Sequence, residues 1–179
     1  MRSLLLLAFF STYALAGPGI DVVGTDARDQ ITTSPDNDTV DARKGDDVII
    51  MGEGQDVAFW QPADGDDFID CGPGLLDTLV IGDNTFQKNR LGEPLFDVDN
   101  SIASCEIERT GRPRTFIAQV LAKPDLTPGG RITLVNCEFV ICADPLQTGK
   151  QVFNLRRPIP RLDDQIPFYA RNNLVNRDL

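Results

Sequence analysis

The chain has 179 residues, a net charge of −10 and no histidine. The lack of histidine excludes a Ser-His-Asp triad, a Cys-His dyad, an HExxH metalloprotease, and zinc or copper sites with histidine ligands. The charge is concentrated: residues 17–80 contain fifteen acidic and three basic residues, whereas the chain from residue 81 onward is close to neutral. Such an acidic block disfavours nucleic acid and anionic membrane surfaces as partners, and it requires cations to neutralise it.

The first sixteen residues are typical of a secretory signal peptide. Arg2 precedes an unbroken apolar run, Leu4 to Phe10, and Ala14-Leu15-Ala16 forms a small-x-small cleavage site. The apolar run is too short to cross a bilayer, which requires about 20 apolar residues. We therefore expect residues 1–16 to be removed and the mature chain to be secreted to the extracellular space, with no membrane span.

An aspartate recurs through the acidic block at nearly constant spacing. The first steps are nine residues long, and the last two are eleven and ten. These aspartates are Asp29, Asp38, Asp47, Asp56, Asp67 and Asp77. Each is followed two positions later by an apolar residue: Ile31, Val40, Ile49, Ala58, Ile69 and Leu79. A disordered acidic tract would lack such regularly spaced apolar residues, so the period indicates a repeat structure.

Turn-forming residues precede most of these aspartates. From Gly24 to Val80 the pattern resembles GGxGxDxUx, where U is a large apolar residue, which is typical of the RTX or hemolysin-type calcium-binding repeat family. The resemblance implies an all-β fold, a short parallel β-roll (β-solenoid) that binds calcium. The implied metal ligands are Asp29, Asp38, Asp47, Asp56, Asp67 and Asp77 together with Gly45, Gly54 and Gly65.

The spacing agrees with the geometry of such a roll. A turn of about six residues and a strand of about three carry the chain halfway round, so about eighteen residues complete one coil. Asp29 then lies beside Asp47, and Asp38 beside Asp56, while the two longer steps that follow require bulges. Glycines in the turns allow carbonyl groups to point at a shared ion, and the aspartates add charge. Calcium takes six to eight oxygen ligands at about 2.3–2.6 Å, which carbonyls and carboxylates together supply.

Several repeats depart from the pattern. The first two lack glycine at both usual positions, and Arg43 and Ala63 replace the second glycine elsewhere. Because side chains restrict the backbone of a turn, we expect about two or three calcium sites instead of five.

Four cysteines in a secreted chain favour two disulfides. Phe68 to Gly74, with Ser104 to Ile107, resembles the IDCGPG-type closing segment of small secreted bacterial β-roll proteins. That resemblance implies a disulfide between Cys71 and Cys105, which leaves Cys137 with Cys142. If residues 138–141 form a regular strand, however, Cys137 and Cys142 lie about 16 Å apart on opposite faces. A disulfide needs Cα atoms within about 7 Å, so either the chain folds back there or these two cysteines pair with Cys71 and Cys105.

The C-terminal part is expected to contain a β-hairpin. Phe116 to Leu121 and Arg131 to Val135 have the composition of strands, and Pro124 and Pro128-Gly129-Gly130 turn the chain between them. We therefore divide the mature chain into a β-roll with its closing segment, residues 17–110, and a hairpin region with a Pro- and Arg-containing tail, residues 111–179.

Three functions are compatible with these features. The favoured one is a secreted, non-enzymatic calcium-binding protein whose acidic roll folds on binding calcium, in adhesion or the extracellular matrix, with an extracellular protein or polysaccharide as partner. The second is a disulfide-stapled effector that binds a protein. The third is an enzyme acting on polysaccharides with Asp46/Asp47 or Asp66/Asp67 as acid and base, although aspartates that recur in every repeat fit a structural role better. The activities of RTX toxins and proteases are not carried over, because fold does not fix function.

Overall fold

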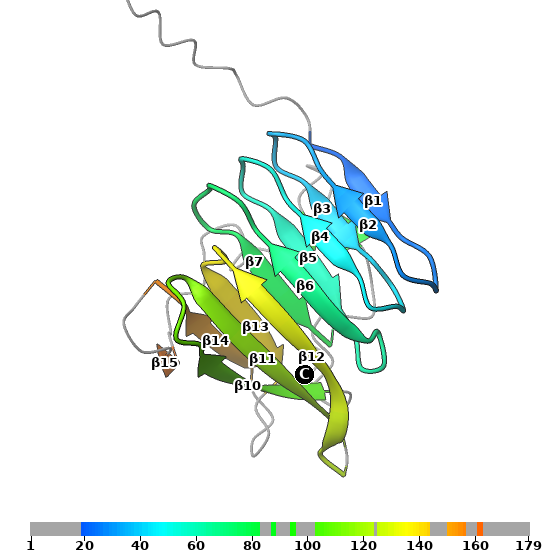
Figure 1. Cartoon of the computed structure of the whole chain (residues 1–179), viewed down its shortest axis with the longest axis vertical. Helices are drawn as coiled ribbons and strands as arrows, with labels where there is room; N and C mark the ends of the chain where they lie inside the picture. Colours follow the sequence, from blue (N-terminus) through cyan, green and yellow to red (C-terminus); the bar gives the residue numbers. More distant parts are fainter. Residues whose placement is uncertain are drawn as a thin grey trace, which may run out of the picture.

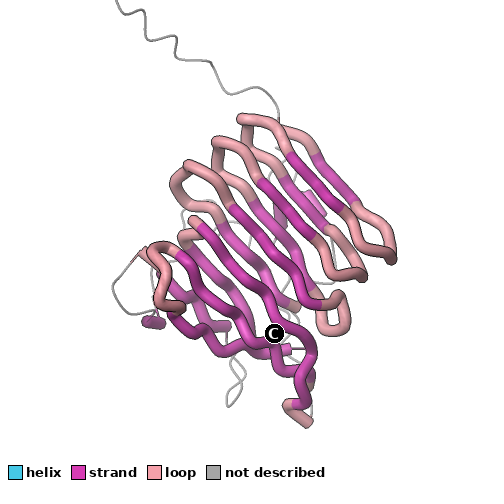
Figure 2. The backbone as a smooth tube through the Cα atoms, in the orientation of Figure 1, coloured by secondary structure: helices cyan, strands magenta, loops and turns pink. Residues whose placement is uncertain are grey.

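The computed structural model describes residues 19–82, 87–88, 94–95, 103–123, 125–143, 150–156 and 161–162. The expected signal peptide and most of the expected tail lie outside these residues. Every element of the described part is a strand, as Figures 1 and 2 show. No helix in these ranges has the length and apolar character needed to cross a membrane.

The described strands follow one another in a regular succession. Thirteen of them belong to one continuous sheet, and β8 and β9 form a separate pair. In chain order they are β1 (Asp21–Val23), β2 (Gln30–Thr32), β3 (Thr39–Asp41), β4 (Val48–Ile50), β5 (Val57–Trp60), β6 (Asp66–Asp70), β7 (Thr78–Ile81), β8 (Gln87–Lys88), β9 (Pro94–Leu95), β10 (Ala103–Arg109), β11 (Thr115–Ala122), β12 (Thr127–Val135), β13 (Phe139–Ala143), β14 (Lys150–Asn154) and β15 (Arg161–Leu162).

The first seven strands form the expected parallel β-roll. Strands β1, β3, β5 and β7 stack on one side, and β2, β4 and β6 stack on the other. The register places Ile31 against Ile49 and Ile49 against Ile69, as an eighteen-residue coil with one lengthened step requires. The all-β roll predicted from the period is therefore confirmed (Figure 1).

The apolar residue of each repeat points into the roll and forms its core. The six predicted core residues are between 0 % and 8 % exposed: Ile31, Val40, Ile49, Ala58, Ile69 and Leu79. Short alternating strands bury one face because successive side chains point to opposite sides of a sheet. Each rung contributes few apolar side chains, so the core of the roll is thin.

One half-coil was missed by the sequence pattern. Strand β1 pairs in parallel with β3, with Val22 against Val40, and it belongs to the same stack. The position of the repeat aspartate is occupied there by Ile20. A pattern defined by aspartate therefore begins one strand too late.

The C-terminal strands close one end of the roll. Strands β11 and β12 form the antiparallel hairpin that the sequence predicted, and β10 pairs with β11. Strand β12 then lies in parallel on β6, and β13 lies in parallel on β7. Each stack therefore gains a strand from the C-terminal half, and the sheet runs continuously from one stack to the other through β10 and β11. We call β10–β13 the cap; in Figure 1 it lies at the end of the roll opposite β1.

The disulfide pairing implied by the resemblance is wrong. Cys71 bonds Cys137 with the Cα atoms 5.0 Å apart, and Cys105 bonds Cys142 with the Cα atoms 6.0 Å apart. Cys71 follows β6 directly and Cys137 follows β12 after Asn136, so the parallel register of the two strands brings the cysteines side by side. Cys105 and Cys142 lie on the neighbouring strands β10 and β13. Residues 139–143 form a strand, so the alternative in which Cys137 and Cys142 pair with Cys71 and Cys105 is the correct one.

The division expected after residue 110 falls between two paired strands. Residues 103–109 of β10 are each opposite a residue of β11. The C-terminal region thus completes the sheet of the roll.

Candidate calcium sites

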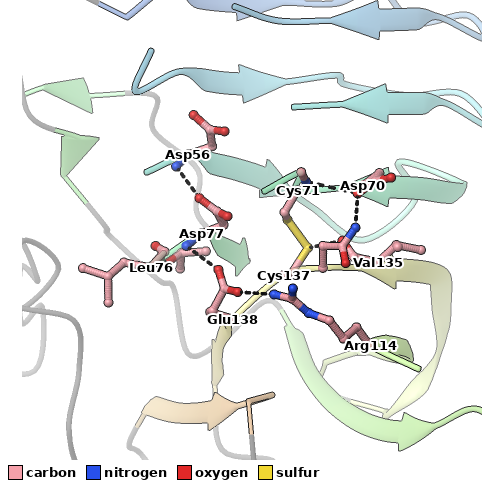
Figure 3. The surroundings of a disulfide bond; sticks show 12 residues. Asp56, Asp70, Cys71, Leu76, Asp77, Arg114, Val135, Cys137 and Glu138 are labelled. Carbon is pink, nitrogen blue, oxygen red and sulfur yellow. Dashed lines mark hydrogen bonds and ion pairs between the residues drawn. A yellow bond between two sulfur atoms is a disulfide. The ribbon is translucent and has the colours of Figure 1, made fainter. Parts of the chain in front are cut away.

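The repeat aspartates line up in two carboxylate ladders, one on each edge of the roll. The first ladder contains Asp38, Asp56 and Asp77, and the second contains Asp29, Asp47 and Asp67. In both ladders, the carboxylate of one aspartate accepts a hydrogen bond from the backbone N–H of the preceding aspartate of that ladder, which lies one coil earlier. Figure 3 shows the end of the first ladder.

The hydrogen bonds of the two ladders are short and uniform. In the first, the N–H groups of Asp38 and Asp56 donate to the carboxylates of Asp56 and Asp77 at 2.8 and 2.9 Å. In the second, the N–H groups of Asp29 and Asp47 donate to Asp47 and Asp67, both at 2.7 Å. The structure therefore brings together the expected pairs Asp29/Asp47 and Asp38/Asp56, and it extends both ladders across the longer steps.

Three of these carboxylates each keep one buried oxygen with no hydrogen-bond partner among the described residues: Oδ2 of Asp47, Asp56 and Asp77. The three residues are at most 1 % exposed. A buried carboxylate oxygen without a partner is costly unless a cation neutralises it. Burial raises the pKa of Asp56 to about 7 and that of Asp77 to about 8, and it also raises the pKa of Asp47. These oxygens are therefore the strongest candidates for cation ligands.

A turn carbonyl of the preceding coil lies beside each of these carboxylates. A Cβ atom built on Gly74 would lie 2.5 Å from the carbonyl oxygen of Gly54 and 2.6 Å from Oδ2 of Asp77. A Cβ on Gly54 would lie 2.3 Å from the carbonyl oxygen of Asp36 and 3.0 Å from Oδ1 of Asp56.

The third position repeats this arrangement on the other edge. A Cβ on Gly45 would lie 2.8 Å from the carbonyl oxygen of Ala27 and 2.7 Å from Oδ1 of Asp47. Only glycine leaves room between the oxygens at such positions. The carbonyl and carboxylate oxygens that converge there are the hard ligands that calcium prefers.

The first carboxylate of each ladder has different surroundings. Asp29 accepts hydrogen bonds from the backbone N–H of Thr25 at 2.6 Å and from its hydroxyl group. Asp38 accepts a bond from the backbone N–H of Ser34 at 2.8 Å, and further bonds from its hydroxyl. Both hydroxyl residues lie four positions before the aspartate, in the two repeats that lack glycine at both usual turn positions. Protein donors thus satisfy these two carboxylates where the turn is least like the family pattern.

The last carboxylate of the second ladder is also satisfied by the protein. Oδ2 of Asp67 accepts a hydrogen bond from Nε1 of Trp60 at 2.5 Å, and Oδ1 accepts the N–H of Asp47. Burial still raises the pKa of Asp67, to about 6. Trp60 ends strand β5 in the step from Asp56 to Asp67, which is eleven residues long instead of nine, so this longer step supplies the final donor of the ladder.

Glu138 ends the first ladder, and the sequence pattern did not reveal it. Its Oε2 accepts the backbone N–H of Asp77 at 3.2 Å, and its Oε1 lies 2.8 Å from Nη2 of Arg114 (Figure 3). The signal was present, because Glu138 is followed two positions later by the core residue Val140. Sixty-one residues separate it from Asp77, so no search for a period of nine could reach it. At this end of the ladder the guanidinium group of Arg114 supplies the positive charge instead of a metal ion.

The predicted turn glycines do adopt the left-handed backbone. Gly45, Gly54 and Gly65 have φ angles of 142°, 147° and 126°. Arg43 and Ala63 also have positive φ, 64° and 74°. A residue with a side chain is strained in this region, so these two substitutions preserve the turn at a cost.

The aspartates next to the second ladder lie outside it. Asp46 and Asp66 are exposed, and the N–H of Asp66 donates to Asp46 at 3.0 Å. Asp47 and Asp67 are buried within the ladder. In each of the pairs Asp46/Asp47 and Asp66/Asp67, one aspartate is thus exposed and the other is buried.

No three acidic or cysteine side chains in the described part form a cluster that could hold a metal by themselves. A calcium ion at the ladders would therefore depend on turn carbonyls as well as on the carboxylates, which is the donor set found beside Gly45, Gly54 and Gly74.

Comparison with known families agrees with this geometry. Residues 23–58 match the RTX calcium-binding nonapeptide repeat in four copies. Comparisons with curated proteins and with solved structures found no match. The class defined by the fold and the ladders is thus a β-roll of calcium-binding repeats. Residues 23–58 are RTX repeats, and RTX repeats bind calcium.

Proposed function

We propose that this protein is a secreted, non-enzymatic calcium-binding module whose acidic roll folds when calcium binds. The observation that carries the proposal is the set of buried carboxylate oxygens without partners on Asp47, Asp56 and Asp77. The repeats and the two disulfides are compatible with an extracellular protein. Outside the cell such a module would act as a rigid element in adhesion or in the extracellular matrix.

The proposed ligands follow the two ladders. The three donor sets lie around Gly45, Gly54 and Gly74, and they combine Asp47 with the carbonyl of Ala27, Asp56 with that of Asp36, and Asp77 with that of Gly54. Asp29, Asp38 and Asp67 form hydrogen bonds within the same ladders. Gly65, with a φ of 126°, allows the turn before β6. Calcium would supply the positive charge that neutralises these carboxylates.

Folding and calcium binding would be coupled by electrostatics. The roll carries most of the protein's negative charge on a thin apolar core, so its carboxylates repel one another in the absence of cations. An ion that binds only the folded roll contributes its binding free energy to folding. Extracellular calcium near the millimolar range suffices even for weak sites.

Far-UV circular dichroism of the mature protein, titrated with calcium and then with chelator, tests this coupling. We expect β-structure to increase with calcium and to decrease again when the chelator is added. A spectrum that responds to neither reagent would contradict the proposal and would favour the disulfide-stapled effector.

The ladder register is tested with a matched pair of variants. Asp47→Asn keeps an oxygen for the N–H of Asp29 but removes the charge, so we expect about tenfold weaker calcium binding. Asp21→Asn removes a charge from the exposed strand β1, outside the ladders, and should leave the calcium titration nearly unchanged. Equal titrations of the two variants would show that the register is wrong.

A further inference from the structure

A basic pocket opens on the cap beside the end of the first ladder. It has a volume of about 530 Å³, and among the described residues its lining includes Arg109, Arg114 and Arg156 around one acid, Glu138. The described lining of this pocket is thus mainly basic, although the net charge of the protein is −10. This local reversal of charge is not explained by calcium binding.

Aromatic rings hold two of the arginines. The guanidinium carbon of Arg109 lies 5.3 Å from the ring centre of Phe116, and that of Arg156 lies 5.7 Å from the ring centre of Phe139. Such stacking favours the cation and restricts the orientation of the planar group. The rings belong to strands β11 and β13, so the rigid sheet of the cap orients these guanidinium groups.

The carboxylate in the pocket lies beneath the arginines. The side chain of Glu138 is 1 % exposed, whereas those of Arg114 and Arg156 are 60 % and 39 % exposed. Oε1 of Glu138 lies 2.8 Å from Nη2 of Arg114 and 4.0 Å from Nε of Arg156. Each guanidinium carries five N–H donors in a fixed fork. A single carboxylate oxygen cannot engage the donors of both groups, so donors remain for a second anion on the solvent side.

We propose that this pocket binds an oxyanion, namely a carboxylate, sulfate or phosphate group of a ligand. Planar guanidinium groups match the geometry of such groups and bind them through paired hydrogen bonds. Glu138 keeps Arg114 in position from below, and the ligand binds from above. The pocket adjoins the third donor set of the roll, because Gly74 lines the pocket and Oε2 of Glu138 accepts the backbone N–H of Asp77.

Titration of the full mature protein with sodium sulfate tests the site, with the arginine Nε–H signals followed by NMR. We expect saturable shifts for Arg109, Arg114 and Arg156, and none with sodium chloride at the same ionic strength. Arg109→Gln and Arg156→Gln should each weaken sulfate binding about tenfold, because each removes a charged hydrogen-bond donor.

Arg112→Gln is the matched control. Arg112 is exposed and lies between β10 and β11, as Arg114 does, but it does not line the pocket. Its replacement should therefore leave sulfate binding unchanged. Arg114→Gln alone would leave Glu138 buried without its partner; the double variant Arg114→Gln/Glu138→Gln avoids this and should also lose sulfate binding. Shifts that do not saturate, equal shifts with chloride, or an equal effect of Arg112→Gln would overturn the proposal.

The same titration with a galacturonic acid tetrasaccharide distinguishes the source of the oxyanion. Tighter binding than sulfate at the same three arginines assigns the site to an acidic polysaccharide. Binding equal to or weaker than sulfate assigns it to a small free anion.

Discussion

Single residues in the turns determine where an ion can bind and what the turn costs. At Gly74 the absent side chain leaves room between the Gly54 carbonyl and the Asp77 carboxylate. At Ala63 a methyl group is present although φ is 74°. The repeat pattern treats both positions as glycine positions, but the reasons differ: one concerns space and the other concerns backbone conformation.

Gly74→Ala should eliminate one calcium site. The added Cβ would lie 2.5 Å from one oxygen and 2.6 Å from another, so the two oxygens could no longer approach a common ion. We expect isothermal titration calorimetry to show about one fewer bound calcium. Gly111→Ala is the control, because a Cβ at Gly111 meets nothing within 4 Å. An unchanged number of ions in Gly74→Ala would show that the site lies elsewhere.

Ala63→Gly should stabilise the protein. A left-handed residue with a side chain costs about 1–2 kcal/mol, and the extra freedom of glycine in the unfolded chain offsets about 0.5–1 kcal/mol of that. The free energy of unfolding should therefore rise by about 0.5–1 kcal/mol, measured by urea denaturation in calcium. Ala27→Gly, in a turn where φ is not positive, should lower it instead. A fall in both variants would argue against strain at Ala63.

At the scale of the strands, the period in the sequence predicted the roll well. The nine-residue step places Ile31, Ile49 and Ile69 in one buried row, because a short strand must turn one side chain inward in every half-coil. The pattern failed at both ends of the roll. It missed β1, where Ile20 replaces the aspartate, and it missed Glu138, which a long excursion separates from Asp77.

The ladders predict a pH dependence for the calcium-free protein. The pKa of Asp67 is raised to about 6, that of Asp56 to about 7 and that of Asp77 to about 8, all mainly because of burial. Burial also raises the pKa of Asp64, a residue outside the ladders, to about 7. In the unfolded chain an aspartate has a pKa of about 3.9. Between these values the folded roll binds more protons than the unfolded chain, so its stability should fall as the pH rises from about 5 to 8.

Melting temperatures of calcium-free protein across this pH range check the prediction. Calcium should reduce the loss at high pH, because it replaces the protons as the counter-charge of the ladders. A melting temperature that rises from pH 5 to 8 without calcium would mean that the carboxylates are not buried as described.

At the scale of the whole molecule, the covalent and the ionic reinforcements lie in different parts. The disulfides join Cys71 to Cys137 and Cys105 to Cys142, so all four cysteines lie in the cap or at its junction with the roll. The coils before Cys71 have no covalent link across them. The family resemblance implied the wrong pairing because only the parallel register of β6 with β12, set by contacts distant in sequence, brings Cys71 to Cys137.

Hydrogen exchange should reveal this division. On removal of calcium we expect backbone amides of residues 19–70 to lose protection, while those of β10–β13 retain it, because the two disulfides restrict the cap. Mass spectrometry of peptides from both parts, with and without chelator, measures the difference. Equal loss of protection in roll and cap would show that the molecule opens as one unit.

The pair of Glu138 and Arg114 at the end of the first ladder has a consequence for the order of folding. Arg114 neutralises Glu138 without a metal ion. Strands β6 and β7 can therefore pair with β12 and β13 before any calcium binds. Strands β12 and β13 are synthesised after the acidic coils, which emerge before them. Folding should therefore proceed from the C-terminal end backwards, against the direction of synthesis. The nascent coils then stay extended until their template exists.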